Sequence, residues 1–217
     1  MKVGTDGVLL GAWAGVRPGD RRILDIGTGT GVIALMLAQR APEAQITGLD
    51  IIDLSDARAN AAASPWSDRL RFEQLPVQEF APAERFDLIL SNPPYFVDSL
   101  TCPDDGRTAA RHAVTLPYEE LCTAVVRLLA PDGRFAVVLP VTETERWLSV
   151  CRGRLYPIRR TEVRTTPRRA PKRVLLEFVR TEPQAALRCD ELVIGTGEHE
   201  CYTEQYRALT RDFYLKF

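Results

Sequence analysis

Apolar positions follow two different patterns along the chain from residue 21 onward. Short apolar runs, typical of buried strands, occupy 21–27, 44–50, 70–74, 86–91 and 134–140. Longer stretches with a helical pattern lie between them, at 31–40, 53–63 and 118–130. Strands that alternate with helices favour an α/β fold, in which helices cover both faces of a mostly parallel sheet.

The pattern changes after Pro140. Residues 156–166 and 172–180 are predicted as two antiparallel strands joined by a basic loop, which brings the sheet to seven strands. Residues 187–194 show only a weak strand pattern. Residues 202–217 are predicted as a terminal helix, and we expect its aromatic residues to anchor it to the core.

Length and composition are those of an ordinary globular protein. Of the 217 residues, 45% are hydrophobic and 26% are charged, with a formal net charge of −1. No repeat or linker divides the chain. We therefore expect a monomer with one domain over residues 1–217, which includes a segment at 1–20 before the first strand and a basic hairpin at 152–180.

Nothing in the sequence predicts a membrane protein or a metalloprotein. No apolar run approaches the length of a membrane span, and the opening residues lack the apolar core of a signal peptide. The five cysteines include no CxxC pair, which favours free thiols in a reducing cytoplasm. Only EHEC at 198–201 offers a candidate metal-binding stretch, and we expect no metal there.

The near-neutral net charge conceals a segregated basic block at residues 152–173. This block contains nine arginine or lysine residues and one acid, Glu162, so it carries +8 and the rest of the chain −9. A cationic block of this kind attracts a polyanion. We predict that the cations at the hairpin loop, which are Arg168, Arg169, Lys172 and Arg173, bind the phosphates of such a polyanion. The alternative is a solvated face of the hairpin.

A glycine-rich loop joins the first strand to the first helix. It reads D-x-G-x-G-x-G, with Asp25, Gly27, Thr28, Gly29 and Gly31 as its candidate ligand-binding residues. Glycines let the backbone turn sharply and let a ligand approach closely. The dinucleotide fingerprint G-x-G-x-x-G is not met, because its last position is Val32.

Two acids indicate what the glycine loop binds. Asp25 precedes the first glycine by two residues, where it suits a cationic group better than a pyrophosphate. Asp50 ends the second strand, 21 residues after Gly29, where an acid can accept hydrogen bonds from ribose hydroxyls. A nucleoside with a positive charge and no phosphate fits both, and S-adenosylmethionine is such a ligand. The alternative is a loop used only for strand–helix packing.

The stretch SNPPYF at 91–96 ends the fourth strand, because prolines cannot donate the hydrogen bonds of a strand ladder. In an open parallel sheet the ligand lies beyond the carboxyl ends of the strands, where Gly27, Asp50 and Asn92 all belong. This placement favours a catalytic role for Asn92, Pro93, Pro94 and Tyr95. The alternative is a turn that merely terminates the strand.

The NPPY residues suit a planar nitrogen nucleophile, an amine or amide. The Asn92 side-chain oxygen and the Pro93 carbonyl can each accept one hydrogen of that nitrogen, which turns its lone pair toward the transferable methyl group. Tyr95 offers a flat face on which an extruded heterocycle can lie. Catalysis would then depend on positioning and would require no strong base. Asn92 is also expected to contact the cofactor.

Together the two motifs resemble the class I S-adenosylmethionine-dependent methyltransferases of exocyclic and amide nitrogens. The stretches MKVGTDGVLLGAW, NAAASPW, SNPPYF, RTAARH, RVLLEF and LTRDFYLKF are similar to those of the bacterial tRNA1(Val) adenine-N6-methyltransferase family. The resemblance covers nearly the whole chain. It implies a Rossmann-like class I methyltransferase fold, S-adenosylmethionine as the cofactor, and N6-methylation of adenine 37 in a tRNA.

The resemblance also implies further cofactor residues. The segment before the first strand lines the pocket in similar enzymes, so Lys2, Thr5 and Asp6 are expected near the cofactor. Members of the family usually carry an additional N-terminal segment. The stretch between Asp50 and Asn60 is shorter than the family pattern, which leaves the role of Asp53 open.

Other functions share part of this pattern. The NPPY motif also serves methylation of a protein glutamine amide, although a protein substrate does not require a block of +8. Methylation of a ribosomal-RNA guanine or of DNA adenine agrees equally with the basic surface. Outside the enzymes, the alternative is a binding protein that keeps the pocket without turnover, against which the intact NPPY motif argues.

Overall fold

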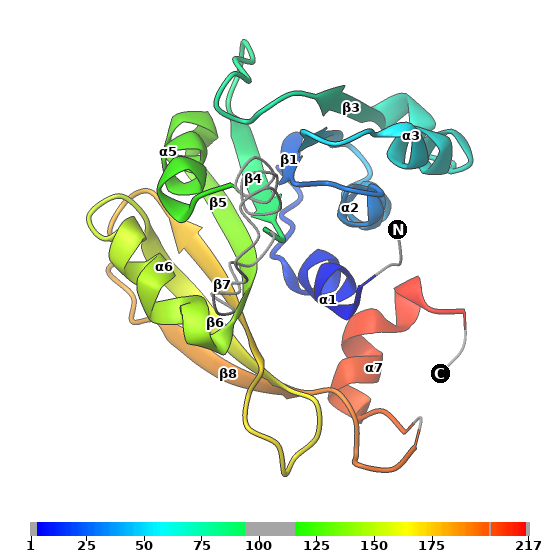
Figure 1. The fold of residues 1–217 in the computed structure, drawn as a ribbon, viewed down its shortest axis with the longest axis vertical. Coiled ribbons are helices and arrows are strands. Elements are labelled where there is room, and N and C mark those ends of the chain that lie inside the picture. The colour runs from blue at the N-terminus through cyan, green and yellow to red at the C-terminus, as the bar shows by residue number, and fades with distance from the viewer. Residues whose placement is uncertain (1–3, 94–115, 200, 216–217) are drawn as a thin grey trace, which may run out of the picture.

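A computed structural model describes residues 4–93, 116–199 and 201–215 (Figure 1). The strands in these ranges are β1 Arg22–Ile26, β2 Gln45–Asp50, β3 Leu70–Gln74, β4 Phe86–Ser91, β5 Leu129–Pro140, β6 Tyr156–Arg164, β7 Arg173–Val179 and β8 Arg188–Val193. The helices are α1 Thr5–Trp13, α2 Val32–Arg40, α3 Ser55–Ala62, α5 Tyr118–Leu128, α6 Thr144–Cys151 and α7 Glu204–Thr210. Among the described residues, none of the helices has the length and apolar character needed to cross a lipid bilayer.

The strands form one sheet of eight, in the order β3-β2-β1-β4-β5-β7-β6-β8. The first five strands of the chain pair in parallel, and β7 is antiparallel to both β5 and β6. The predicted mostly parallel α/β sheet with an antiparallel hairpin is therefore confirmed. The sheet has one strand more than the predicted seven, because β8 pairs with β6 at the edge.

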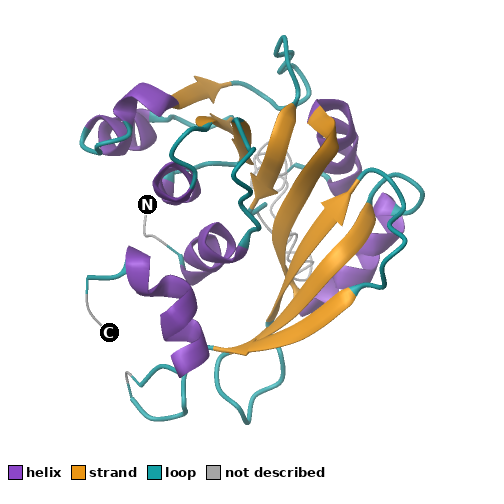
Figure 2. Ribbon diagram, turned by 180° about the vertical axis from the view of Figure 1, so that it is seen from behind, coloured by secondary structure: helices purple, strands orange, loops and turns teal. Residues whose placement is uncertain are grey.

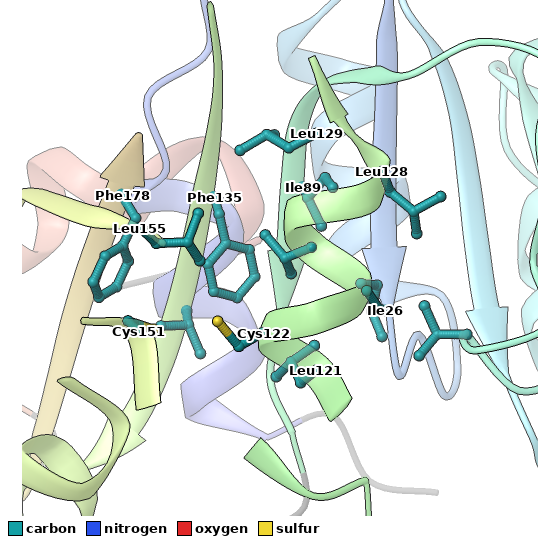
Figure 3. Close-up of a cluster of buried hydrophobic side chains, with 14 of the residues drawn as sticks. Ile26, Ile89, Leu121, Cys122, Leu128, Leu129, Phe135, Cys151, Leu155 and Phe178 are labelled. Atoms are coloured by element: carbon teal, nitrogen blue, oxygen red, sulfur yellow. The ribbon is translucent and has the colours of Figure 1, made fainter. Parts of the chain in front are cut away.

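Helices cover both faces of the sheet (Figure 2). One face carries α5 and α6, and the other carries α1, α2 and α7. Successive residues of a strand point to opposite faces, so β5 contributes Phe135 and Val137 to one core cluster and Ala136 and Val138 to the other. This explains why the central strands read as continuous apolar runs. Figure 3 shows the cluster beneath α5, where Leu121 and Leu128 lie close to the sheet.

Two helices were not expected from the sequence. In α1, every residue from Gly7 to Trp13 is buried, so the helix has no polar face and no amphipathic pattern. A side chain at Gly11 would lie 2.8 Å from the Met36 sulfur, so glycine there lets α1 approach α2 closely. The other helix, α6, has only eight residues. Both pack against the core, which stabilises elements whose local sequence is a weak signal.

The predicted terminal helix is shorter than expected, since α7 has seven residues. It begins after Thr203, whose hydroxyl accepts a hydrogen bond from the Tyr206 backbone N–H at 3.2 Å. The predicted hairpin is confirmed by β6 and β7, and residues 165–172 form the loop between them.

Candidate active site

The predicted ligand-binding residues meet at the carboxyl edge of the sheet. Strand β1 lies between β2 and β4, where the order of the strands reverses. Ile26 is in register with Leu49 on one side and with Ser91 on the other. The Ser91 hydroxyl donates a hydrogen bond to the Ile26 carbonyl at 2.9 Å, and Ser91 is buried. The register therefore brings the residues that follow these three strands together at the carboxyl edge, where a sheet of this topology forms its ligand crevice.

The glycine loop takes a conformation that requires glycine. Gly27, Gly29 and Gly31 have φ angles of 76°, 54° and 78°, a left-handed region that strains other residues. The backbone N–H groups of Gly27 and Thr28 both donate to the Leu49 carbonyl, at 2.8 and 3.0 Å. The loop is thus tied to the end of β2 and leads directly into α2.

Both carboxylate oxygens of Asp50 accept backbone hydrogen bonds, and one of them comes from the glycine loop. Its Oδ2 accepts from the Gly29 N–H at 2.9 Å, and its Oδ1 accepts from the Ile51 N–H at 2.8 Å. The predicted contact with ribose hydroxyls would use the remaining lone pairs. Ile51 and Ile52 are 41% and 39% exposed beside this acid, and sequence reasoning did not single them out. The signal was two apolar residues directly after the acid.

Asp25 is a fully buried acid at the base of the crevice. Its Oδ2 accepts from the Thr28 hydroxyl at 2.6 Å, whereas Oδ1 is buried without a hydrogen bond from the described residues. Burial is the main reason why the pKa of Asp25 rises from 3.8 to about 7, and the Thr28 hydrogen bond opposes this rise. The negative charge of Asp50 raises the pKa further. A buried carboxylate oxygen without a donor fits the cationic amino group of S-adenosylmethionine.

The other predicted catalytic and cofactor residues are only partly described. Asn92 is half-buried and Pro93 is buried at the end of β4. Lys2, Pro94 and Tyr95 lie outside the described residues. Thr5 is exposed at the start of α1, and its role stays a prediction.

Asp6 forms an unexpected contact with the basic hairpin. Its Oδ2 accepts from the Arg173 Nε at 2.8 Å, an ion pair that joins α1 to the start of β7. Arg173 is in register with Pro140 at the carboxyl end of β5. The two residues predicted for different ligands, one for the cofactor and one for a polyanion, therefore contact each other at the carboxyl edge of the sheet.

The loop at 165–172 lies at this same edge (Figure 1, below β6 and β7). The flanking arginines have acidic partners: Arg159 pairs with Asp190, Arg160 with Glu162, and Arg164 with Glu191. By contrast, Arg168, Arg169 and Lys172 form no ion pair within the part of the chain that the structure describes. Within the hairpin, the basic residues thus divide into arginines of β6 that have acidic partners and a cationic loop. Arg152 and Arg154, which precede β6, also form no ion pair among the described residues.

A cavity and the candidate metal-binding stretch belong to other parts of the molecule. A cavity of about 630 Å³ lies at the opposite edge, where Arg22, Gln45 and Phe86 begin their strands. In the ranges described, no three histidine, cysteine or acidic residues gather as a metal site would require. Of the EHEC stretch, residue 200 lies outside those ranges.

Comparison with known proteins identifies the chemistry of related chains. Residues 19–164 match the family described as "Methyltransferase domain". The chain is 46% identical to the tRNA1(Val) (adenine(37)-N6)-methyltransferase of Bacteroides thetaiotaomicron, over 99% of this chain and 91% of that protein. It is 44% identical to the protein of the same description from Flavobacterium johnsoniae, over 100% of this chain and 93% of that one.

Solved structures share the fold at low sequence identity. A predicted O-methyltransferase from Agrobacterium tumefaciens superimposes with a TM-score of 0.72 at 17% identity, over 95% of this chain and 96% of that one. A glycopeptide N-methyltransferase in complex with S-adenosylmethionine gives a TM-score of 0.55 at 15% identity, over 77% of this chain and 90% of that one.

Proposed function

Because this chain belongs to the tRNA1(Val) (adenine(37)-N6)-methyltransferase family, we propose that it transfers a methyl group from S-adenosylmethionine to the exocyclic amine of adenine 37 in that tRNA. The observation that carries this proposal is the crevice where the glycine loop and Asp25 meet the end of β4. The enzyme acts as a monomeric single domain in the cytoplasm.

Some residues of the crevice hold the cofactor, and others position the amine of the substrate. Asp25 binds the amino group of the methionine moiety, and Asp50 holds the glycine loop against the nucleoside. When bound, S-adenosylmethionine supplies an electrophilic methyl group on a sulfonium. The Asn92 oxygen and the Pro93 carbonyl accept the two amine hydrogens, so the nitrogen lone pair points at that methyl group. The new N–C bond forms as the S–C bond breaks, and the amine then releases one proton to water.

A labelling experiment tests the activity directly. The protein is incubated with a tRNA1(Val) transcript and labelled cofactor, and the digested nucleosides are analysed. We expect label in N6-methyladenosine, and none with a transcript that has guanine at position 37. In parallel incubations with ribosomal RNA, DNA or protein, label in a guanine, an adenine or a glutamine, with none in the tRNA, would contradict the proposal.

Asp50→Ala is expected to weaken cofactor binding by about 1–3 kcal/mol, the scale of charge-assisted hydrogen bonds. The variant loses the acceptor of the Gly29 N–H and the proposed ribose contact. Calorimetry measures the effect. The matched control is Asp53→Ala, since Asp53 accepts from the Ser55 backbone N–H at 3.2 Å on the same exposed loop. If the parent and the Asp50 variant bind the cofactor with equal affinity, Asp50 does not belong to the cofactor site.

The cationic loop binds the phosphates of the tRNA. Arg168, Arg169 and Lys172 have no acidic partner in the described structure, and their loop lies at the carboxyl edge of the sheet. Arg173 belongs to the base of the loop, where its pair with Asp6 reduces its net charge toward a ligand. Phosphate contacts of this kind orient a nucleic acid and carry no sequence information.

Changing Arg168, Arg169 and Lys172 together to glutamine is expected to weaken tRNA binding and flatten its salt dependence. The slope of log affinity against log salt should fall by about 0.7–0.9 for each phosphate that the variant no longer neutralises. Titrations at several salt concentrations measure it, and cofactor affinity should not change. The control changes Arg21, Arg85 and Arg188, three arginines at the opposite edge of the sheet, of which Arg21 and Arg188 have the acidic partners Glu43 and Asp190. Equal slopes in the parent and the loop variant would show that the loop is only a solvated face and does not bind the tRNA phosphates.

A further inference from the structure

Three tyrosines form a row of rings near the carboxyl end of the chain. One of them belongs to α7, and the other two lie before and after this helix in the sequence. The ring centroids of Tyr202 and Tyr206 are 5.3 Å apart, and those of Tyr206 and Tyr214 are 6.4 Å apart. The hydroxyls of Tyr206 and Tyr214 lie 3.1 Å from each other. The expectation that these aromatic residues anchor the core is met by Tyr206, which is 2% exposed. It is not met by Tyr202 and Tyr214, which are 37% and 38% exposed.

The row begins at the base of the cationic loop. Strand β8 runs parallel to β6, so its carboxyl end lies at the carboxyl edge of the sheet, as the cationic loop does. The Gly195 N–H donates to the carbonyl of Thr165, the first residue of the loop, at 2.9 Å. Gly195 in turn forms a β-bridge with Tyr202. Backbone hydrogen bonds therefore hold the Tyr202 segment against the loop that carries Arg168, Arg169 and Lys172 (Figure 1).

Exposed aromatic rings next to unpaired cations have a characteristic partner. Cations contact the phosphates of a single strand, while aromatic rings stack on its bases, because every base has a flat π face. Base-paired RNA hides those faces inside the helix, so such rings select unpaired loops. Two tyrosines held in place by a third lose little conformational freedom when they bind, which favours affinity. A protein partner would not require the three cations at this place.

We propose that Tyr202 and Tyr214 form a stacking surface for unpaired bases of the RNA substrate, continuous with the cationic loop. This inference rests on the proposed function, since adenine 37 lies in an unpaired loop of the tRNA. One unpaired base rests on an exposed tyrosine while the phosphates of the same strand contact the loop. The stacked base is a different nucleotide from the adenine that enters the crevice beside Asn92.

Binding of a short RNA stem–loop tests the surface. Tyr202→Ala and Tyr214→Ala are each expected to weaken binding about 5-fold to 150-fold, the usual range for removal of a base–aromatic stack. Tyr202→Phe and Tyr214→Phe should bind as the parent does, because the ring is retained. The slope of log affinity against log salt should stay unchanged, since the cations that neutralise the phosphates are all retained. Neither alanine variant should alter the affinity for a fully paired duplex of the same length.

Further variants separate stacking from a loss of structure. Tyr202→Leu keeps an apolar side chain of comparable size without a π face, so it should bind as weakly as Tyr202→Ala. Tyr156→Ala removes a half-buried tyrosine at the opposite edge of the sheet, and its RNA affinity should equal that of the parent. Cofactor affinity, measured by calorimetry, should be the same in all variants.

Two results would overturn the stacking surface. One is parental stem–loop affinity in both alanine variants, and the other is an equal loss for stem–loop and duplex RNA. Both leave the proposed function standing if the parent still methylates adenine 37. A parent that binds the stem–loop through these tyrosines but transfers no methyl group to tRNA would contradict the function and support the surface.

Discussion

Asn92→Ala is expected to lower turnover by about a hundredfold or more while cofactor affinity stays nearly unchanged, as for the loss of a positioning group. Asn92 directly follows Ser91, which is held against β1 by register and by its hydrogen bond to the Ile26 carbonyl. The backbone at the end of β4 is therefore held at the carboxyl edge of the sheet, where we expect the Asn92 side-chain oxygen to orient the amine of the substrate. Single-turnover kinetics at saturating cofactor measure the change, and calorimetry measures the affinity.

Asn60→Ala is the matched control for this variant. The Asn60 side-chain N–H₂ donates to the Thr30 carbonyl at 3.0 Å, so it supports the glycine loop from the side of α3. Its removal should leave turnover at saturating cofactor unchanged, and any effect should appear in cofactor affinity. If Asn92→Ala keeps its turnover and loses only cofactor affinity, then Asn92 belongs to the pocket and the proposed methyl-transfer geometry is wrong.

Asp25→Asn is expected to remove a large pH dependence of stability. The pKa of Asp25 is about 7 in the folded protein against an ordinary value of 3.8, so the fold favours the protonated acid. The free energy of unfolding therefore falls as the pH rises from about 4 to about 7, by about 4 kcal/mol for a shift of this size. The asparagine variant lacks this loss. Denaturant unfolding without cofactor, at pH 4 and pH 8, measures the difference between the two proteins.

The same substitution should abolish most cofactor binding. Only the ionised carboxylate attracts the amino group of S-adenosylmethionine, so the affinity of the parent should rise up to about pH 7 and then level off. The asparagine variant should bind weakly at every pH. Thr28→Val removes the hydroxyl that donates to Asp25 at 2.6 Å, so it should move the transition to higher pH. Parental affinity in Asp25→Asn, with the same pH profile, would exclude Asp25 from the cofactor site.

Local chemistry explains why much of the site was predictable. The turn between β1 and α2 needs positive φ angles at Gly27, Gly29 and Gly31, and only glycine adopts them without strain. The prolines after Asn92 end β4 whatever surrounds them. Because parallel strands place their carboxyl ends at one edge, the sequence order of strands and helices was enough to bring these segments together.

Other parts depend on contacts between distant residues. β8 is an edge strand in which Leu192 is the one buried residue, so its sequence has little strand pattern and its pairing with β6 defines it. The helix α1 was missed because burial on all sides removes the polar face on which helix prediction depends. Ile51 and Ile52 were not singled out because the sequence does not show that two apolar side chains beside Asp50 stay exposed.

By itself, the sequence determined the α/β class, the glycine loop, the strand that ends at NPPY and the presence of a +8 block. Each of these follows from backbone preference, apolar periodicity or composition over a few residues. Only the tertiary structure decided which cations have acidic partners, since Arg173 meets Asp6 from 167 residues away. It also decided which tyrosines stay exposed beside the cationic loop. Charge neutralisation and burial are set by neighbours in space, and the fold alone determines those neighbours.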